Sequence, residues 1–142
     1  MNTAPLMYQI IDHTADLGII VKGVNEKDVF IRAAYAMTDL MIEGDIVEKT
    51  VIKDVSLQGD DFPDLMVKWL GEILYLFNGE KLVVHSIEIK FISSIMLRAT
   101  LALSTFEPKH HQVKREIKAV TYHQISVDNV NDGWQARIIF DI

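Results

Sequence analysis

The sequence predicts an α+β fold, a largely antiparallel sheet with two amphipathic helices packed on one face. Two segments repeat apolar residues with the period of a helix, and most of the remaining chain alternates apolar and polar residues with period two. No Pro-, Gly- or Ser-rich linker divides the 142 residues. A chain of this length has room for one domain, so we interpret residues 1–142 as a single domain.

The first predicted helix follows Asn25, which is a suitable N-cap. Asp28 favours the positive end of the helix dipole, and Gly44 is a suitable stop signal after the last apolar residue. The residues that form one buried stripe are Val29, Phe30, Ala33, Ala34, Met37, Leu40 and Met41.

The second predicted helix covers about residues 62–77. Asp61 would cap it, Pro63 is tolerated in its first turn, and Asn78-Gly79 would end it. Its apolar stripe consists of Leu65, Met66, Trp69, Leu70, Ile73, Leu74 and Phe77. Gly71 lies inside this helix and costs about 0.5–1 kcal/mol relative to alanine, so we expect close packing against it.

Alternation with period two predicts strands in the remaining segments. These segments are residues 8–11, 17–21, 47–57, 83–91, 95–103, 119–127 and 134–141. Ser93-Ser94 predicts a hairpin between two of them, and residues 128–133 form a loop rich in turn formers. His85 falls on an apolar strand face with Phe91, which predicts a histidine in the core.

The composition indicates a cytoplasmic globular protein. Hydrophobic residues make up 49% of the chain and charged residues 24%, and no window approaches the ~20 apolar residues of a membrane span. The first ten residues do not resemble a signal peptide. The absence of cysteine excludes disulfides, thiolate metal sites and thiol nucleophiles.

The net charge of −6 argues against a free-standing nucleic-acid-binding module, because such modules neutralise phosphates with a basic face. An acidic chain is better suited to a basic protein partner or to a hard cation. We therefore expect no stable direct binding to nucleic acid, and no membrane association.

Two acidic clusters have both a structural and a functional interpretation. Residues 12–16 form either a polar turn, whose aspartates accept backbone N–H bonds, or part of a site. Asp141 lies next to the terminal carboxylate of Ile142, so two anions repel each other there. They either fray into solvent or, if the last strand is held in the sheet, become ligands of a hard metal.

The third cluster is the basic stretch from His110 to Lys118. A solvated loop that enters a strand explains it, and contact with phosphates or with the acidic rim of a partner is the functional alternative. His123 shares a face with Thr121 and Ile125 and fits either a core or a surface position. No Ser-His-Asp grouping or glycine-rich phosphate loop can be placed, so the residues alone do not indicate an enzyme.

Three stretches together resemble the archease family. They are Asp12-His-Thr-Ala-Asp-Leu-Gly18, Glu116-Ile-Lys-Ala-Val-Thr-Tyr-His123 and the closing residues 134–142. The resemblance covers essentially the whole chain, and the His-Thr-Ala-Asp element with a penultimate aspartate is fairly specific. It implies a non-catalytic protein cofactor of RtcB-type RNA ligases, which join RNA ends after tRNA introns are removed. The cofactor speeds guanylylation of the ligase by GTP and a divalent metal, and it permits multiple turnover.

The resemblance also implies a metal ion, generally calcium. Its ligands transfer to Asp16, Asp141 and Ile142, the last through its backbone or carboxylate oxygens. Within the Lys-Ala-x-Thr-Tyr-His pattern, Lys118 is the implied contact to the partner or its nucleotide. The further candidates for this contact are Asp12, His13 and His123.

Two other functions stay open at this point. One is a chaperone or modulator of RNA-modifying enzymes such as tRNA methyltransferases, an older suggestion for the family. That function predicts co-purification with a methyltransferase. The other is a metal-dependent hydrolase, which is motivated only by the carboxylates and histidines and for which we expect no turnover of phosphoester substrates.

Overall fold

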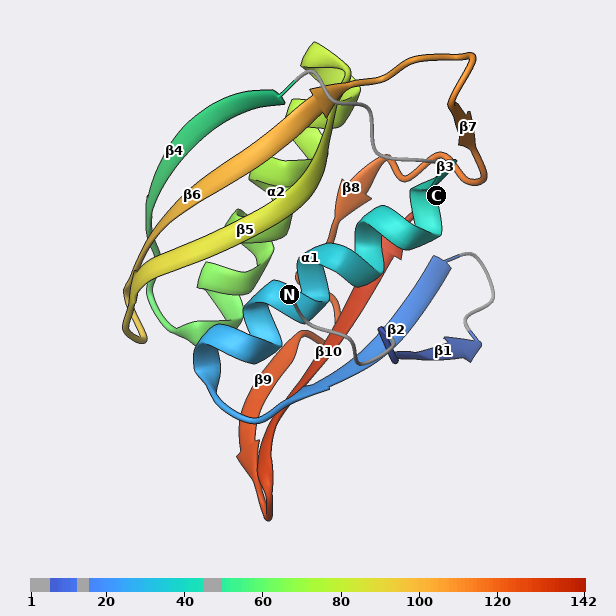
Figure 1. Cartoon of the computed structure of the whole chain (residues 1–142). Coiled ribbons are helices and arrows are strands. Elements are labelled where there is room, and N and C mark those ends of the chain that lie inside the picture. Colours follow the sequence, from blue (N-terminus) through green and yellow to red (C-terminus); the bar gives the residue numbers. More distant parts are fainter. Residues whose placement is uncertain (1–5, 13–15, 45–49) are drawn as a thin grey trace.

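Two helices lie between two antiparallel sheets in the computed structural model, which describes residues 6–12, 16–44 and 50–142 (Figure 1). This arrangement confirms the α+β class. The expectation of one sheet with helices on one face is wrong in detail, because the described strands form three separate sheets of five, two and three strands. Sheets therefore cover the helix pair from two sides.

The five-stranded sheet joins the two ends of the described chain. β1 (Gln9–Asp12), β2 (Asp16–Gly23) and β10 (Gly133–Asp141) follow one another as antiparallel neighbours. β8 (Ala119–Val120) and β9 (Ser126–Val130) pair with two different parts of β10. The predicted loop at 128–133 is shorter than expected, because β9 continues to Val130 and only a tight turn precedes β10.

The three-stranded sheet has the order β4 (Thr50–Gln58), β6 (Met96–Thr105) and β5 (Leu82–Ile92). The hairpin predicted around Ser93-Ser94 is thus confirmed. The pairing of β5 with β6 has two register irregularities, one between Val84 and Ser86 and one between Ile89 and Phe91.

These irregularities explain two errors in the predicted strand faces. A bulge rotates the following residues relative to simple alternation. Phe91 is consequently 41% exposed instead of buried. His85 is half-buried, and its Nε2 lies 3.5 Å from the Thr50 hydroxyl, so it is not a core histidine.

The smallest sheet pairs β3 (Ile42–Gly44) with β7 (His111–Val113). The expectation that Gly44 is a helix stop signal is therefore wrong. Gly44 is a strand residue opposite His111. Its φ of +141° favours glycine, and an added Cβ would overlap the carbonyl oxygen of His110.

Both helices begin where the sequence predicts. α1 (Glu26–Met41) is capped by Asn25, whose Oδ1 accepts the Asp28 N–H at 2.8 Å. α2 (Phe62–Glu80) is capped by Asp61, whose Oδ1 accepts the Asp64 N–H at 2.9 Å. These local bonds stabilise N–H groups that have no partner within the helix.

The end of α2 lies beyond the predicted Asn78-Gly79. Lys81 adopts the left-handed conformation, with φ 57° and ψ 40°, and its N–H donates to the carbonyls of Leu76 and Phe77. This residue, rather than the glycine, closes the helix. In the described ranges, no helix is long and apolar enough to cross a membrane.

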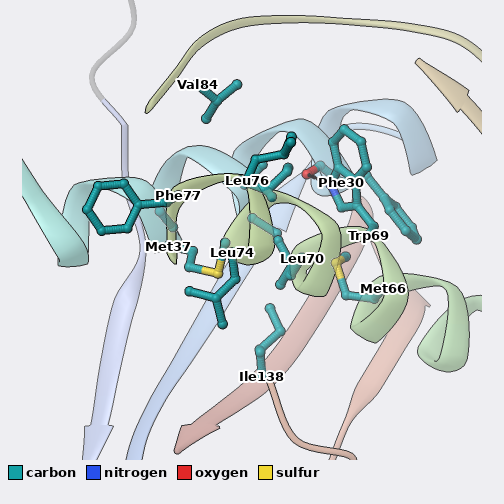
Figure 2. Close-up of a cluster of buried hydrophobic side chains, with 14 of the residues drawn as sticks. Phe30, Met37, Met66, Trp69, Leu70, Leu74, Leu76, Phe77, Val84 and Ile138 are labelled. Carbon is teal, nitrogen blue, oxygen red and sulfur yellow. Dashed lines mark hydrogen bonds between the residues drawn. The ribbon is translucent and has the colours of Figure 1, made fainter. Parts of the chain in front are cut away.

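The second covering sheet follows from the width of the apolar surface of α2. Besides the predicted stripe, Val67 and Leu76 are buried. Figure 2 shows Leu76 on the side of Val84 from β5, whereas Leu74 lies on the side of Ile138 from β10. An apolar surface this wide cannot be covered by a single sheet, so one layer packs on each side.

Gly71→Ala is expected to stabilise the protein by about 0.5–1 kcal/mol, because a Cβ there would meet nothing within 4 Å. The predicted close packing at Gly71 is wrong. Urea unfolding measures the change as a higher midpoint. Gly44→Ala is the control and should lower the midpoint, because its positive φ and the His110 carbonyl oppose a side chain. A lower midpoint for Gly71→Ala would show that a side chain at this position of α2 is not accommodated.

Candidate functional site

The end of the five-stranded sheet brings together the residues implied as metal ligands. β2 and β10 pair so that Asp141 lies directly opposite Asp16. Directly opposite residues of an antiparallel pair have Cβ atoms about 4.5–5.5 Å apart, so the two carboxylates leave the sheet side by side. Ile142 follows at once and is 46% exposed.

Alternation along the strands places the two aspartates on the sheet face that points away from the helices. The neighbouring residues that belong to the core on the opposite face are Ile19, Val21, Ile138 and Phe140. On the outer face, the next register pair is Gly18 and Ile139. A Cβ at Gly18 would lie 2.6 Å from Cγ1 of Ile11 and 2.9 Å from Cδ1 of Ile139, so the glycine lets these side chains meet.

Lys118 lies at the same edge. Its N–H donates to the Asp141 carbonyl at 2.7 Å, and Ala119 then pairs with Asp141. The Lys118 side chain is exposed. The implied partner contact and the implied metal ligands are therefore neighbours, although they come from separate parts of the sequence.

The other residues implied as partner contacts are Asp12, His13 and His123, and the structure describes them only in part. Asp12 ends β1 opposite Leu17, so its backbone belongs to the same edge. The side chain of Asp12 and all of His13 lie outside the described residues. His123 is exposed in the connection from β8 to β9, and its N–H donates to the Thr121 hydroxyl at 3.2 Å.

The donor chemistry of this edge fits a hard cation. The carboxylates of Asp16 and Asp141 and the backbone oxygens of Ile142 are the oxygen ligands that Ca²⁺ and Mg²⁺ prefer. Like charges directly opposite each other destabilise a sheet, and a divalent cation between them would offset this repulsion. Among the described residues, no three His, Asp or Glu side chains gather as a metal site. A cation here would therefore also need backbone oxygens or water.

The basic stretch from His110 to Lys118 is not wholly a solvated loop, because it includes β7 and a buried histidine. His111 is only 7% exposed, and its ring stacks on Phe106 with centroids 5.5 Å apart. Its Nδ1 accepts the Glu107 N–H at 2.9 Å. Among the described residues, the buried histidine is His111, and the expectation of a core position for His85 was wrong.

Sequence reasoning missed one contact near this edge. The Tyr122 hydroxyl donates to Oδ1 of Asp64 at 2.7 Å and so joins the connection after β8 to the first turn of α2. Asp64 also accepts the Asp60 N–H at 2.8 Å and pairs with Lys68 at 3.2 Å. The one feature of the sequence that singles out Tyr122 is its position inside the Lys-Ala-x-Thr-Tyr-His pattern.

This contact shifts the acidity of both partners. The hydrogen bond from Tyr122, together with the Asp60 N–H, holds the pKa of Asp64 below its ordinary value of 3.8. The same bond, followed by desolvation, raises the pKa of Tyr122 above 10.0.

Comparison with known proteins now settles the family. The model of the archease protein family (MTH1598/TM1083) matches residues 8–142. The chain belongs to the archease family. Protein archease of Methanosarcina acetivorans is 33% identical over 139 residues, which cover 95% of each chain. Protein archease of Pyrococcus furiosus is 33% identical over 135 residues, which cover 92% of this chain and 95% of that one.

Solved archease structures share the fold. The solution structure of Methanobacterium thermoautotrophicum protein 1598 has a TM-score of 0.72 at 24% identity and covers 95% of this chain and 98% of its own. A crystal structure of an archease from Thermotoga maritima, described as a possible chaperone, has a TM-score of 0.63 at 20% identity. The match covers 96% of this chain and 98% of that one. The resemblance to the archease family and its fold is confirmed.

Tyr122→Phe should lower stability in a way that depends on pH. The pKa of Asp64 is depressed in the folded state, so the stability from this bond is present above 3.8 and lost as pH falls through the lower folded value. The pKa of Tyr122 is raised, so its contribution is present below 10.0 and lost as pH rises through the folded value.

Urea unfolding at a series of pH values measures this difference between wild type and Tyr122→Phe. We expect a constant gap from about pH 5 to about pH 9 that narrows below about pH 4 and above about pH 10. Tyr75→Phe is a matched control, because Tyr75 lies on α2 and is 58% exposed, as Tyr122 is. A gap that persists unchanged in strong acid would show that Asp64 is not the relevant partner.

Proposed function

We propose that this archease is a non-catalytic, metal-binding protein cofactor of an RtcB-type RNA-splicing ligase, and that it promotes guanylylation and multiple turnover of the ligase. The observation that carries the proposal is the register pair of Asp16 and Asp141, with Lys118 bonded beside it. Membership of the archease family supports the choice of partner.

The proposed cation lies at the edge formed by Asp16, Asp141 and Ile142. Ca²⁺ suits this edge best, because it accepts 6–8 oxygen ligands in irregular geometry, including backbone oxygens and water. A structural zinc site is disfavoured, because the chain has no cysteine. When bound, the cation supplies positive charge that neutralises the two carboxylates and fixes their orientation.

The residues of this edge act by recognition. The edge needs only to bind the nucleotide- and metal-loaded state of the ligase better than its other states. A preference of ~1.4 kcal/mol shifts that equilibrium tenfold. The exposed Lys118 ammonium can pair with a phosphate of the nucleotide or with a carboxylate of the partner. Asp12, His13 and His123 are secondary candidates for the same contact.

This mechanism requires neither stable binding to RNA nor a membrane. The chain carries a net charge of −6, which favours a basic protein surface over phosphates. We place the function in the cytoplasm, as the sequence predicts.

Asp16→Asn and Asp141→Asn each remove one carboxylate while preserving side-chain size. With a cognate ligase, GTP and metal, catalytic amounts of the wild type should stimulate guanylylation of the ligase. The stimulation by each variant should be at least about tenfold weaker than that by the wild type. Asp132→Asn is the control, because it makes the same change in the tight turn before β10, at the other end of that strand.

A second readout tests the metal without the ligase. Ca²⁺ should raise the Tm of the wild type and of Asp132→Asn, and should leave Asp16→Asn and Asp141→Asn unchanged, because only the folded, liganded state is stabilised. Full stimulation of the ligase by Asp141→Asn would sink the proposal. A normal Ca²⁺ response without ligase stimulation would retain the metal site and reject the partner.

A chaperone or modulator of tRNA methyltransferases is the second candidate, favoured by the description of the Thermotoga maritima archease as a possible chaperone. Suppression of methyltransferase aggregation, undiminished by Asp141→Asn, would support it. The expectation of no enzyme activity stays a prediction, which incubation with metal and phosphoesters tests.

A further inference from the structure

A cleft of about 280 Å³ lies beside the C-terminal ends of both helices. Phe77 lines it from α2, Lys81 from the C-cap of that helix, Phe106 from the segment after β6, and Val113 from β7. Arg115 and Glu116 complete it from the stretch that follows β7. None of these residues belongs to the edge of Asp16 and Asp141.

The aromatic wall of the cleft is held in place by its neighbours. The rings of Phe77 and Phe106 meet edge to face, with centroids 5.8 Å apart at 71°. The other side of the wall is fixed as well, because Phe106 stacks on the buried His111. Val113 is 46% exposed and leaves apolar surface at the rim. These contacts hold the apolar wall of the cleft in one arrangement, which limits the cost of ordering it on binding.

The charges around the recess are mainly positive. Lys81 is exposed, and its Nζ lies 5.3 Å from the centroid of the Phe77 ring. Arg115 donates one N–H to the Leu40 carbonyl at 3.2 Å, which engages one of the five N–H groups of its guanidinium. Glu116 is the single acidic residue among the described lining residues.

The positive charge around the recess is opposite in sign to the net charge of the whole chain. The charged residues that line the cleft are two basic ones, Lys81 and Arg115, and one acidic one, Glu116, whereas the net charge of the protein is −6. A local positive region on an acidic protein attracts carboxylates and repels other positive surfaces. Arginine in particular binds a carboxylate with two parallel hydrogen bonds.

The size and lining of the recess suit a single side chain. Its volume of about 280 Å³ lies at the lower end of the ~300–1,000 Å³ of small-molecule sites, and its wall is apolar and aromatic, which favours an aromatic side chain. Interfaces between proteins are typically anchored by single aromatic side chains in such pockets, with charged groups around them.

We propose that this cleft binds an acidic peptide segment of a partner protein, with one aromatic side chain of the segment against Phe77 and Phe106. Carboxylates flanking that aromatic residue pair with Lys81 and Arg115. The inference goes beyond the proposed ligase function, because it concerns a different surface and does not depend on which protein supplies the segment.

The test uses the peptide acetyl-Asp-Phe-Asp-Asp-amide and its charge-reversed counterpart acetyl-Lys-Phe-Lys-Lys-amide, titrated into the ¹⁵N-labelled full chain. The acidic peptide should shift the backbone amide signals of Lys81, Phe106 and Val113, and the basic peptide should not. Equal shifts with both peptides would remove the charge argument and overturn the proposal. So would shifts in these amides with GTP but not with the acidic peptide.

Two variants locate the site. Lys81→Asn removes the charge while asparagine still tolerates the left-handed conformation, and it should weaken binding about two- to five-fold. Lys27→Asn is its matched control on an exposed lysine of α1 and should leave peptide binding unchanged.

Val113→Asp should abolish peptide binding by placing a carboxylate at the rim of the cleft. Val24→Asp is its control, at a valine that is 74% exposed, and should leave binding unchanged. Unchanged binding to Val113→Asp would also overturn the proposal.

Discussion

The antiparallel pairing of β2 with β10 is the constraint on which the rest of the structure depends. Its register is fixed because a slip by one residue would turn Ile138 and Phe140 out of the core. Burying each such side chain stabilises the fold by about 1.5–3 kcal/mol, whereas a surface charge pair is worth about 1 kcal/mol or less. The apolar face therefore sets the register, and the opposed carboxylates of Asp16 and Asp141 follow from it. A cation bound at this edge, as proposed above, would relieve the repulsion between them.

Local features of the fold could be predicted from the sequence, and features that depend on distant partners could not. The caps at Asn25 and Asp61 and the hairpin at Ser93-Ser94 depend on residues a few positions apart. The division into separate sheets depends on both sides of α2 being apolar, which a single stripe does not reveal. The exposed position of Phe91 follows from a bulge, and the end of α2 at Lys81 depends on a lysine in a conformation that usually favours glycine.

The candidate site was predictable only in part, for the same reason. Spacing left open whether Asp141 frays into solvent, and only the resemblance to archeases joined it to Asp16. The structure holds Asp141 in β10, between Asp16 and Ala119, with its carbonyl bonded to Lys118. The contact between Tyr122 and Asp64 could not be derived from spacing, because it joins two surface residues from distant segments.

The stretch from Lys114 to Lys118 connects the two surfaces proposed here. It has no regular secondary structure, yet the Lys114 N–H donates to Met41 at 2.7 Å and the Lys118 N–H donates to Asp141. Between them, the Ile117 carbonyl accepts a bond from the Asn78 side chain at 3.1 Å. These bonds attach the segment between the basic cleft and the acidic edge to α1, α2 and β10. A partner that engages both gains from effective concentration, since the second contact forms within the complex. Because the two surfaces differ in the sign of their charge, a partner with complementary charges can satisfy both in only one orientation.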